Sequence, residues 1–474
     1  MTKSTKDKLF TSTIAGMLGM IWFSIAFGAP IPMLFEVMTG SGILLGLYTT
    51  LLQLSTIFQI PSVIFSEYFP SRKIYWGFIA LSNRILWIAP VILILLFWDR
   101  PNLAALLLII FLSLAACFGN SGNPIWFDWM ADIIPSNISE RYWGIRQSLT
   151  SAMFFVTTIF AGYILDKFPG PDKAGGSYTG FLIVFTLAAI AGIVDISLHL
   201  TIPDDRKPVE RNISNLLDKL ISPFKNQDFR NMTLSCASWV MTIGIIGPFS
   251  LIYLKRVFSA TYTDIAIISS AGSLGAVLFG FINGIIIDKI GARTYFCIAT
   301  SLIPFTWIVW FFAGDSIYNF NLSFISIKIS EIVLFITISS LLGGILASGI
   351  AVCQIHMCNA LSEQKWRRFA IAEHWATIGV ISAIGPFIGG AITDYFTHHP
   401  IQIILPSAKN MSFIHILIFL ATLICWGLAM PLMLRVKANK DDLSIGYVLK
   451  TVYFFPLRGA GLTFNYLKSI LRQK

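Results

Sequence analysis

Apolar residues fill long stretches of this chain, and short polar segments separate them. Twelve such stretches are centred near residues 23, 54, 85, 115, 155, 190, 242, 275, 304, 340, 382 and 423. A helix of about 20 apolar residues is long enough to cross a ~30 Å hydrocarbon core. Lipid offers no partner to an unpaired backbone group, so such spans are helical. The pattern predicts an all-α polytopic membrane protein with twelve transmembrane helices.

The composition agrees with this pattern. Hydrophobic residues make up 55% of the 474 residues, charged residues 12%, and the mean hydropathy is +0.74. Soluble domains carry about 25% charged residues, so a soluble protein is excluded.

The longest polar stretch between apolar segments divides the chain into two halves. We predict a first six-helix bundle over residues 1–202, a linker over 203–230, a second bundle over 231–435 and a basic cytoplasmic tail over 436–474. Apolar residues within the linker recur at helical spacing, which predicts a short amphipathic helix lying on the membrane surface.

The net charge of +10 raises the question of a nucleic-acid partner. With an even number of helices and a cytoplasmic N-terminus, 26 of the 34 Lys and Arg residues fall in cytoplasmic segments. This asymmetry is the positive-inside rule, and it accounts for the charge without nucleic acid. We therefore expect a multi-pass protein of the cell (inner or plasma) membrane with both termini in the cytoplasm.

Short motifs recur at matching points of the two halves. "SEYFPSR" (66–72) follows the second predicted helix and "IDKIGAR" (287–293) follows the eighth. "GYILDKF" (162–168) and "GAITDYF" (390–396) end the fifth and eleventh helices. Two motif pairs in register indicate a duplicated six-helix unit.

The loop after the eighth helix, Gly-x-x-x-Asp-Lys-x-Gly-x-Arg, resembles the signature of the major facilitator superfamily. It places Gly284, Asp288, Lys289, Gly291 and Arg293 at the signature positions. The resemblance implies two pseudosymmetric six-helix bundles. It also implies a secondary active transporter that moves a small solute by alternating access, with the solute bound near the membrane midplane between the bundles.

The chain departs from the family pattern in places. In the N-terminal copy of the loop, Glu67 replaces the aspartate, Pro70 the glycine, and Val63 the small residue. "GPFIGG" (385–390) resembles an element that family antiporters carry on helix 5, but here it lies on helix 11, so it does not establish antiport. Residues 123–147 resemble a loop of uncharacterised bacterial members.

The charged turn over residues 284–293 connects two predicted helices, and its charges suit a contact that must form and break as the protein changes conformation. We call such a contact a latch. Gly291 permits a turn that other residues resist, Asp288 can cap a neighbouring helix, and Lys289 and Arg293 can pair with acids. The resemblance implies that this cluster latches the halves on the cytoplasmic side. The predicted cytoplasmic gate comprises Gly284, Asp288, Lys289, Gly291, Arg293, Glu67, Arg72, Asp128, Asp132, Arg141, Arg146, Glu373 and His374.

Alternatives stay open for several gate residues. For Asp128 and Asp132, we favour a gate network with Arg141 and Arg146 over a role in proton coupling. For Glu373 and His374, we favour a solvated pair at a helix end over a site that titrates near neutral pH. Asp195 and His199 lie on one face of helix 6 at the cytoplasmic border. For this pair we favour a role in a gate or an interface over a role in carrying the solute.

Arg84 is the cation that the sequence places deepest in the membrane. It lies about ten positions into its helix, near mid-bilayer at ~1.5 Å per residue, and an intramembrane charge marks function by default. The alternative is a structural ion pair or an amide partner such as Asn120 or Asn123. The polar residues near mid-membrane suit a small polar or anionic solute, and the candidates for substrate or coupling are Arg84, Asn83, Asn120, Asn123, Gln53 and Gln59.

Other function classes have less support. No G-x-S-x-G, no H-E-x-x-H and no clustered metal-ligand spacing occurs, so we expect neither an enzyme nor a cofactor. We expect a monomer in the lipid bilayer with a small-molecule solute, and leave open whether a proton or cation is coupled. A drug or metabolite exporter, and a receptor or scaffold of the same fold, remain alternatives.

Overall fold

A computed structural model describes residues 3–437, apart from 67, 70, 136–137, 174, 205–221, 323–324, 363–366 and 407–408. Helices form the first half. Their bounds are α1 (Lys3–Ala26), α2 (Pro30–Thr39), α3 (Gly42–Leu54), η1 (Ser55–Phe58), α4 (Gln59–Ser66), α5 (Arg72–Leu86), α6 (Ala89–Phe97), α7 (Pro101–Ile133), α8 (Ser139–Lys167) and α9 (Thr179–His199).

The second half repeats this helical pattern and adds a β-hairpin. Its two strands pair antiparallel, with Ile317 opposite Ser330 and Leu322 opposite Ile325. The elements are α11 (Gln227–Phe258), α12 (Tyr262–Ile290), α13 (Ala292–Thr306), η3 (Trp307–Phe311), β1 (Ile317–Leu322), β2 (Ile325–Ser330), α14 (Glu331–Leu361), α15 (Arg367–Ser382), α16 (Ile384–His398), α17 (Phe413–Ile424), η5 (Cys425–Ala429) and α18 (Met430–Leu434).

Twelve helical spans within the described residues are long and apolar enough to cross a membrane. All twelve predicted segment centres fall inside them, which confirms the predicted spans. The first described helix of the second half, α11, starts at Gln227, within the predicted linker over 203–230. The predicted linker helix (within 205–221) and nearly all of the C-terminal tail (438–474) lie outside the described residues.

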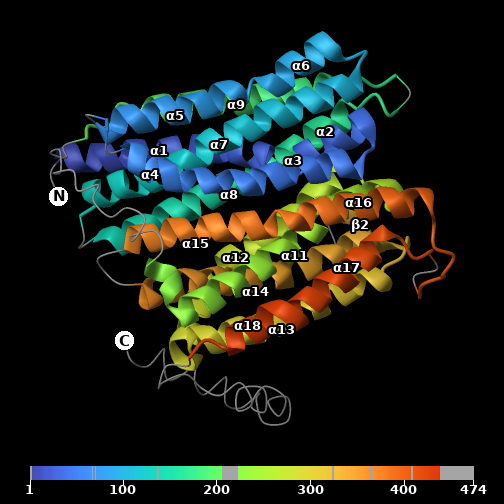
Figure 1. The fold of residues 1–474 in the computed structure, drawn as a ribbon. Coiled ribbons are helices and arrows are strands. Elements are labelled where there is room, and N and C mark those ends of the chain that lie inside the picture. The colour runs from blue at the N-terminus through green and yellow to red at the C-terminus, as the bar shows by residue number, and fades with distance from the viewer. Residues whose placement is uncertain are drawn as a thin grey trace.

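The helices form two bundles that lie side by side, one from each half of the chain (Figure 1). We call the face at which α1 begins the proximal face, and the face that α1 and α2 reach at Thr39 the distal face. The segments between α2 and α3 and between α16 and α17 lie at the distal face, where α3 and α16 run close together (Figure 1).

Proline interrupts two spans of the first bundle. The first span breaks after Ala26, and α2 starts at Pro30. The third breaks after Leu86, and Pro90 stands in the first turn of α6. Proline lacks an N–H and is favoured in the first turn of a helix, so each break falls where a new helix can start. The second break leaves Arg84 in the last turn of α5.

The buried core is shared between the bundles at one face and divided at the other. Towards the distal face, one continuous cluster joins α2 of the first bundle to α11 of the second, through Phe35, Phe249 and Tyr253 among others. Towards the proximal face there are two clusters, one within each bundle. The first includes Leu9, Tyr75, Trp129 and Ile196, and the second includes Phe229, Ile287, Phe296 and Met357.

Candidate functional site

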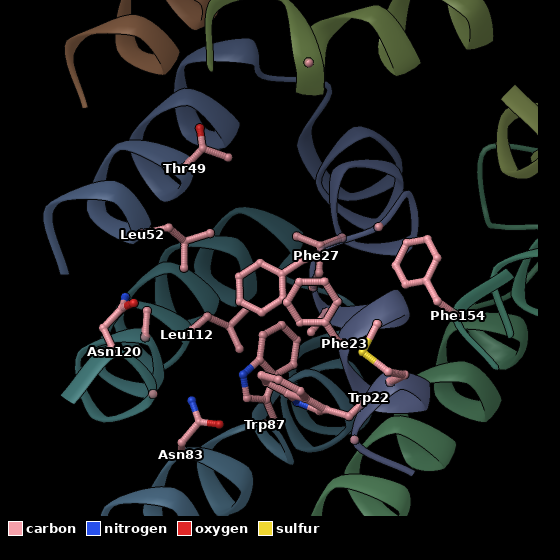
Figure 2. Close-up of a pocket in the computed structure, with 18 of the residues that line it drawn as sticks. Trp22, Phe23, Phe27, Thr49, Leu52, Asn83, Trp87, Leu112, Asn120 and Phe154 are labelled. Atoms are coloured by element: carbon pink, nitrogen blue, oxygen red, sulfur yellow. The ribbon is translucent and has the colours of Figure 1, made fainter. Parts of the chain in front are cut away.

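A cavity of about 970 Å³ lies between the two bundles. The first bundle contributes most of its polar lining, and α11, α12, α14 and α16 contribute small and apolar residues. Figure 2 shows Trp22, Phe23, Phe27 and Trp87 grouped in one part of the wall, with Asn83 and Asn120 nearby. A concave space with a few polar groups in an apolar wall is the usual form of a small-molecule site.

Arg84 lines this cavity and pairs with an acid from another helix. One terminal guanidinium nitrogen lies 3.1 Å from Oδ2 of Asp195 on α9, and the other donates to Oδ1 of Asn83 over 2.6 Å. The guanidinium carbon also lies 3.4 Å from the ring centroid of Trp22, a cation–π contact. The structure thus provides the ion pair considered from sequence, with Asp195 in place of Asn120 or Asn123.

Asp195 links Arg84 to His199. Its second carboxylate oxygen lies 3.0 Å from Nδ1 of His199, one turn further along α9. Glycines make room for this network: a Cβ on Gly19 would stand 2.7 Å from Oδ2 of Asp195, and one on Gly192 2.7 Å from Cδ of Arg84. Asp195 and His199 therefore belong to the cavity wall as a buried network with Arg84.

Arg146 also lines the cavity, away from the acids with which a gate was predicted. Its guanidinium carbon lies 4.9 Å from the ring centroid of Trp126 and 5.5 Å from that of Trp143. Among the described residues, no carboxylate lies within salt-bridge distance of it. Gly16 accommodates this side chain, because a Cβ there would stand 3.2 Å from Nε of Arg146.

Most of the predicted mid-membrane polar residues reach the cavity. Gln53, Asn83, Asn120 and Asn123 line it. Asn83 donates to the carbonyl of Ala115 over 2.6 Å, and Asn120 donates to Oγ of Ser55 over 2.7 Å. Gln59 is buried outside the lining.

Arg72 gathers three carboxylates at the proximal end of the first bundle. Its guanidinium nitrogens lie 2.9 Å from Asp128, 2.7 Å from Asp132 and 3.0 Å from Asp204. Asp128 and Asp132 thus pair with Arg72 within one bundle and not with Arg146. Glu67 and the side chain of Arg141 lie outside the described residues.

The corner after α12 has the turn predicted for it. Gly291 has φ +90°, a conformation that favours glycine. Arg293 donates to the carbonyls of Met433 (3.3 Å) and Leu434 (2.7 Å) at the end of α18, where a cation complements the helix dipole.

The remaining signature residues lie on the exposed side of this corner. Asp288 and Lys289 are exposed, and a Cβ on Gly284 would meet open space. Asp288 has no hydrogen-bond or ion-pair partner within the part of the chain that the structure describes. Its role as a latch stays a prediction, and it concerns another conformation.

Glu373 and His374 are buried, and their interpretation as a solvated helix-end pair was wrong. The exposed fractions are 4% for Glu373 and 1% for His374. The imidazole bonds to Oγ1 of Thr233 on α11 (2.9 Å) and to the amide of Gln354 on α14 (3.0 Å). Helices packed around α15 cover this turn although it lies near the helix start. Both carboxyl oxygens of Glu373 are buried without a hydrogen-bond partner.

Four sets of hydrogen bonds join the bundles among the described residues, and all lie in the distal half. Asp394 accepts from the backbone N–H groups of Gly42 (2.5 Å) and Ile43 (3.0 Å) at the start of α3. Asp166 accepts from those of Tyr262 and Thr263 (both 2.8 Å) at the start of α12. The other two sets are Arg256 with Glu36 and Gly40, and Thr50 with Ala383.

The distal halves of the bundles approach so closely that only glycine fits at some points. A Cβ on Gly46 would stand 2.6 Å from the carbonyl oxygen of Pro386, and one on Gly162 2.7 Å from that of Tyr262. The "GPFIGG" element therefore lies where α16 packs against α3.

Sequence reasoning identified Arg84 but missed its partner. The available signal was an acid and a histidine four residues apart on an otherwise apolar helix, which is costly in lipid unless both are paired. Within the described residues, no group of three or more His, Cys, Asp or Glu side chains has the arrangement of a metal site.

No protein-family model and no curated protein matches the chain. Solved structures do match. A variant of the nucleoside transporter NupG is 11% identical with a TM-score of 0.67, covering 91% of this chain and 100% of that one. A bacterial homologue of the human lysosomal transporter Spinster, inward-facing and unoccupied, is 14% identical with a TM-score of 0.65, covering 93% and 100%. A D-xylose–proton symporter is 13% identical with a TM-score of 0.62, covering 91% and 99%. The chain has the fold of the major facilitator superfamily transporters, as the loop motif predicted.

Proposed function

We propose that the protein is a secondary active transporter that moves a small solute by alternating access between its two bundles. The observation that carries this proposal is a polar cavity between bundles whose shared apolar core and interbundle hydrogen bonds, among the described residues, lie in the distal half. The distal side has a shared apolar core, four sets of interbundle hydrogen bonds and glycine-mediated helix contacts. On the proximal side each bundle has its own core.

The proposed orientation is supported by the basic residues. Among the described residues, the proximal segments carry most of the Lys and Arg residues, which favours the cytoplasm for that face. The described conformation is then inward-facing, with the cavity reaching His199 at the proximal end of α9. Likeness to an inward-facing Spinster homologue supports this assignment.

Arg84, Asp195 and His199 are the proposed polar centre of the solute site, joined by Asn83, Asn120, Asn123 and Gln53. We propose a proton as the first coupling ion to test, because the cavity holds a carboxylate and an imidazole in contact. The proximal loop residues Asp288, Lys289 and Arg293 are the proposed latch of the opposite, outward-facing state.

Transport can be tested with the purified protein in proteoliposomes. Uptake of labelled nucleosides, sugars and organic anions would be followed with and without an imposed pH gradient. The matched control is Gly46→Trp, which places a large side chain where α3 meets α16 and blocks distal closure. Uptake of a solute by the wild type, and its loss in the control, is the expected result.

The exporter and scaffold alternatives give different outcomes. An exporter would load solute preferentially from the face that is cytoplasmic in cells. A receptor or scaffold would bind a solute in detergent and move none across the vesicle membrane, and that result would overturn the proposal.

A further inference from the structure

The charges around the cavity do not balance. Besides Tyr48, its ionisable lining residues are Arg84, Arg146, Asp195 and His199. With a neutral imidazole, two guanidinium groups and one carboxylate leave a formal charge of +1. Asp195 contacts Arg84 directly, whereas no described carboxylate lies within salt-bridge distance of Arg146, so Arg146 is the cation left without a direct counter-charge.

Unsatisfied donors occur on the same side chains. Nε of Arg84, Nε of Arg146 and Nε1 of Trp22 are buried without a hydrogen-bond partner, and all three residues line the cavity. Native structures seldom leave buried donors unpaired, and such groups call for an explanation. A ligand rich in acceptor oxygens supplies one.

The aromatic residues of the cavity wall indicate the shape of the part of the ligand that carries no charge. Trp22 packs edge-on against Trp87 (ring centroids 5.6 Å apart) and Phe27 (5.7 Å), and Figure 2 shows these rings together in the cavity wall. Trp126 and Trp143 flank the guanidinium of Arg146. A planar or apolar body fits such a wall.

We propose that the cavity binds an organic monocarboxylate, with its carboxylate on Arg146 and its planar body against the Trp22–Trp87 wall. This rests on the proposed transport function, whose solute site it specifies. A single negative charge neutralises the lining, whereas a dication or a neutral polyol leaves Arg146 uncompensated. Arginine suits this role because its planar fork matches a carboxylate in two parallel hydrogen bonds.

The binding test uses three matched probes on the purified full-length protein: hippurate, its neutral amide hippuramide, and the cation N-(2-aminoethyl)benzamide. Titration calorimetry and thermal shift report affinity and stabilisation. Hippurate is expected to bind at least tenfold more tightly than either counterpart. Equal binding of the amide, tighter binding of the cation, or no binding of hippurate overturns the proposal. Tighter binding of phenyl phosphate than of hippurate would reject a monocarboxylate in favour of a phosphate ligand.

Variants assign the contact to Arg146. Arg146→Gln is expected to lose tenfold or more in hippurate affinity, and Arg146→Lys to recover part of it. Arg100→Gln, an exposed arginine on the distal loop, is the matched control and keeps wild-type affinity. Wild-type affinity in a folded Arg146→Gln protein would overturn the assignment; should that variant not fold, the three-probe comparison on the wild type still decides the ligand class.

Flux separates this inference from the transport proposal. Labelled hippurate would be followed in proteoliposomes alongside the cation. Hippurate binding without flux would leave the anion site standing and overturn transport. Flux of the cation, without hippurate binding, would leave transport standing and overturn the anion site.

Discussion

Asp166 and Asp394 make the same contact in opposite directions. Each is the aspartate of the repeated G-x-I-x-D-x-F motif at the distal end of its bundle. Each accepts two backbone N–H groups from the first turn of a helix in the other bundle. Asp166 lies on α8 and reaches α12, whereas Asp394 lies on α16 and reaches α3. A carboxylate at a helix N-terminus satisfies orphan donors and complements the helix dipole.

Both contacts should help to hold the distal side closed. Asp166→Asn and Asp394→Asn should each shift the population towards a distal-open state, because a hydrogen bond to a charged group contributes about 1.5–3 kcal/mol. Spin-label distances between the distal loops 171–173 and 399–401 should lengthen. Asp99→Asn, an exposed aspartate on another distal loop, is the control. Unchanged distances in both folded variants would contradict a closing role.

The opposite change is expected at the proximal corner. If Asp288 helps to hold the outward-facing state, Asp288→Asn should favour the inward-facing state. Loss of one charge-assisted contact, again about 1.5–3 kcal/mol, is enough to move a balanced equilibrium about tenfold or more. Distances across the proximal mouth would report the shift, and an unchanged distribution in a well-folded variant would reject the latch.

Arg84 and Asp195 should behave as one unit in stability. Removing one partner of a buried ion pair costs about 3–5 kcal/mol, because the other charge is left without compensation. Arg84→Gln and Asp195→Asn alone should therefore lower the melting temperature more than the double variant does. A double-mutant cycle in detergent measures this coupling. Additive single effects would show that the two residues act separately.

Arg84→Lys tests whether this arginine also binds solute. Lysine keeps the charge but not the planar fork that contacts Asp195 and Asn83. If Arg84 serves solute binding, affinity should fall in a variant whose folding is verified. Wild-type affinity with reduced melting temperature would mark Arg84 as a structural residue and leave binding to other groups of the cavity.

Glu373→Gln should leave stability unchanged or raise it. Both carboxyl oxygens of Glu373 are buried without a partner, and burying an unpaired ionisable group is unfavourable. An amide of the same shape cannot ionise and can donate. A strong fall in melting temperature would reveal a partner that the described conformation lacks. His374→Ala is the comparison, and it should destabilise because it breaks bonds to Thr233 and Gln354.

The sequence predicted the spans well because membrane burial leaves a signal in every segment. It also placed Arg84 in the membrane and Gly291 in a turn, since both properties depend on local sequence. The partner of a buried charge was harder to predict. Asp195 lies 111 residues from Arg84 along the chain, and hydropathy does not indicate which helices are neighbours. Glu373 was misread for the same reason, because its place near a helix start suggested solvent where α11 and α14 provide cover.

The distal contacts of Asp166 and Asp394 have a consequence for how this protein diverges among its relatives. Each aspartate binds main-chain N–H groups, which every residue except proline supplies. At positions 43, 262 and 263 the side chain can thus change without loss of the contact, provided that the helix still starts there. Position 42 is constrained to glycine for a separate reason, because a Cβ there would stand 2.9 Å from Oδ1 of Asp394. The contact therefore does not require that the two residues in it change together during evolution. A search for paired substitutions across the bundles would miss these contacts, and a search for an acid at the end of α8 and α16 would find them.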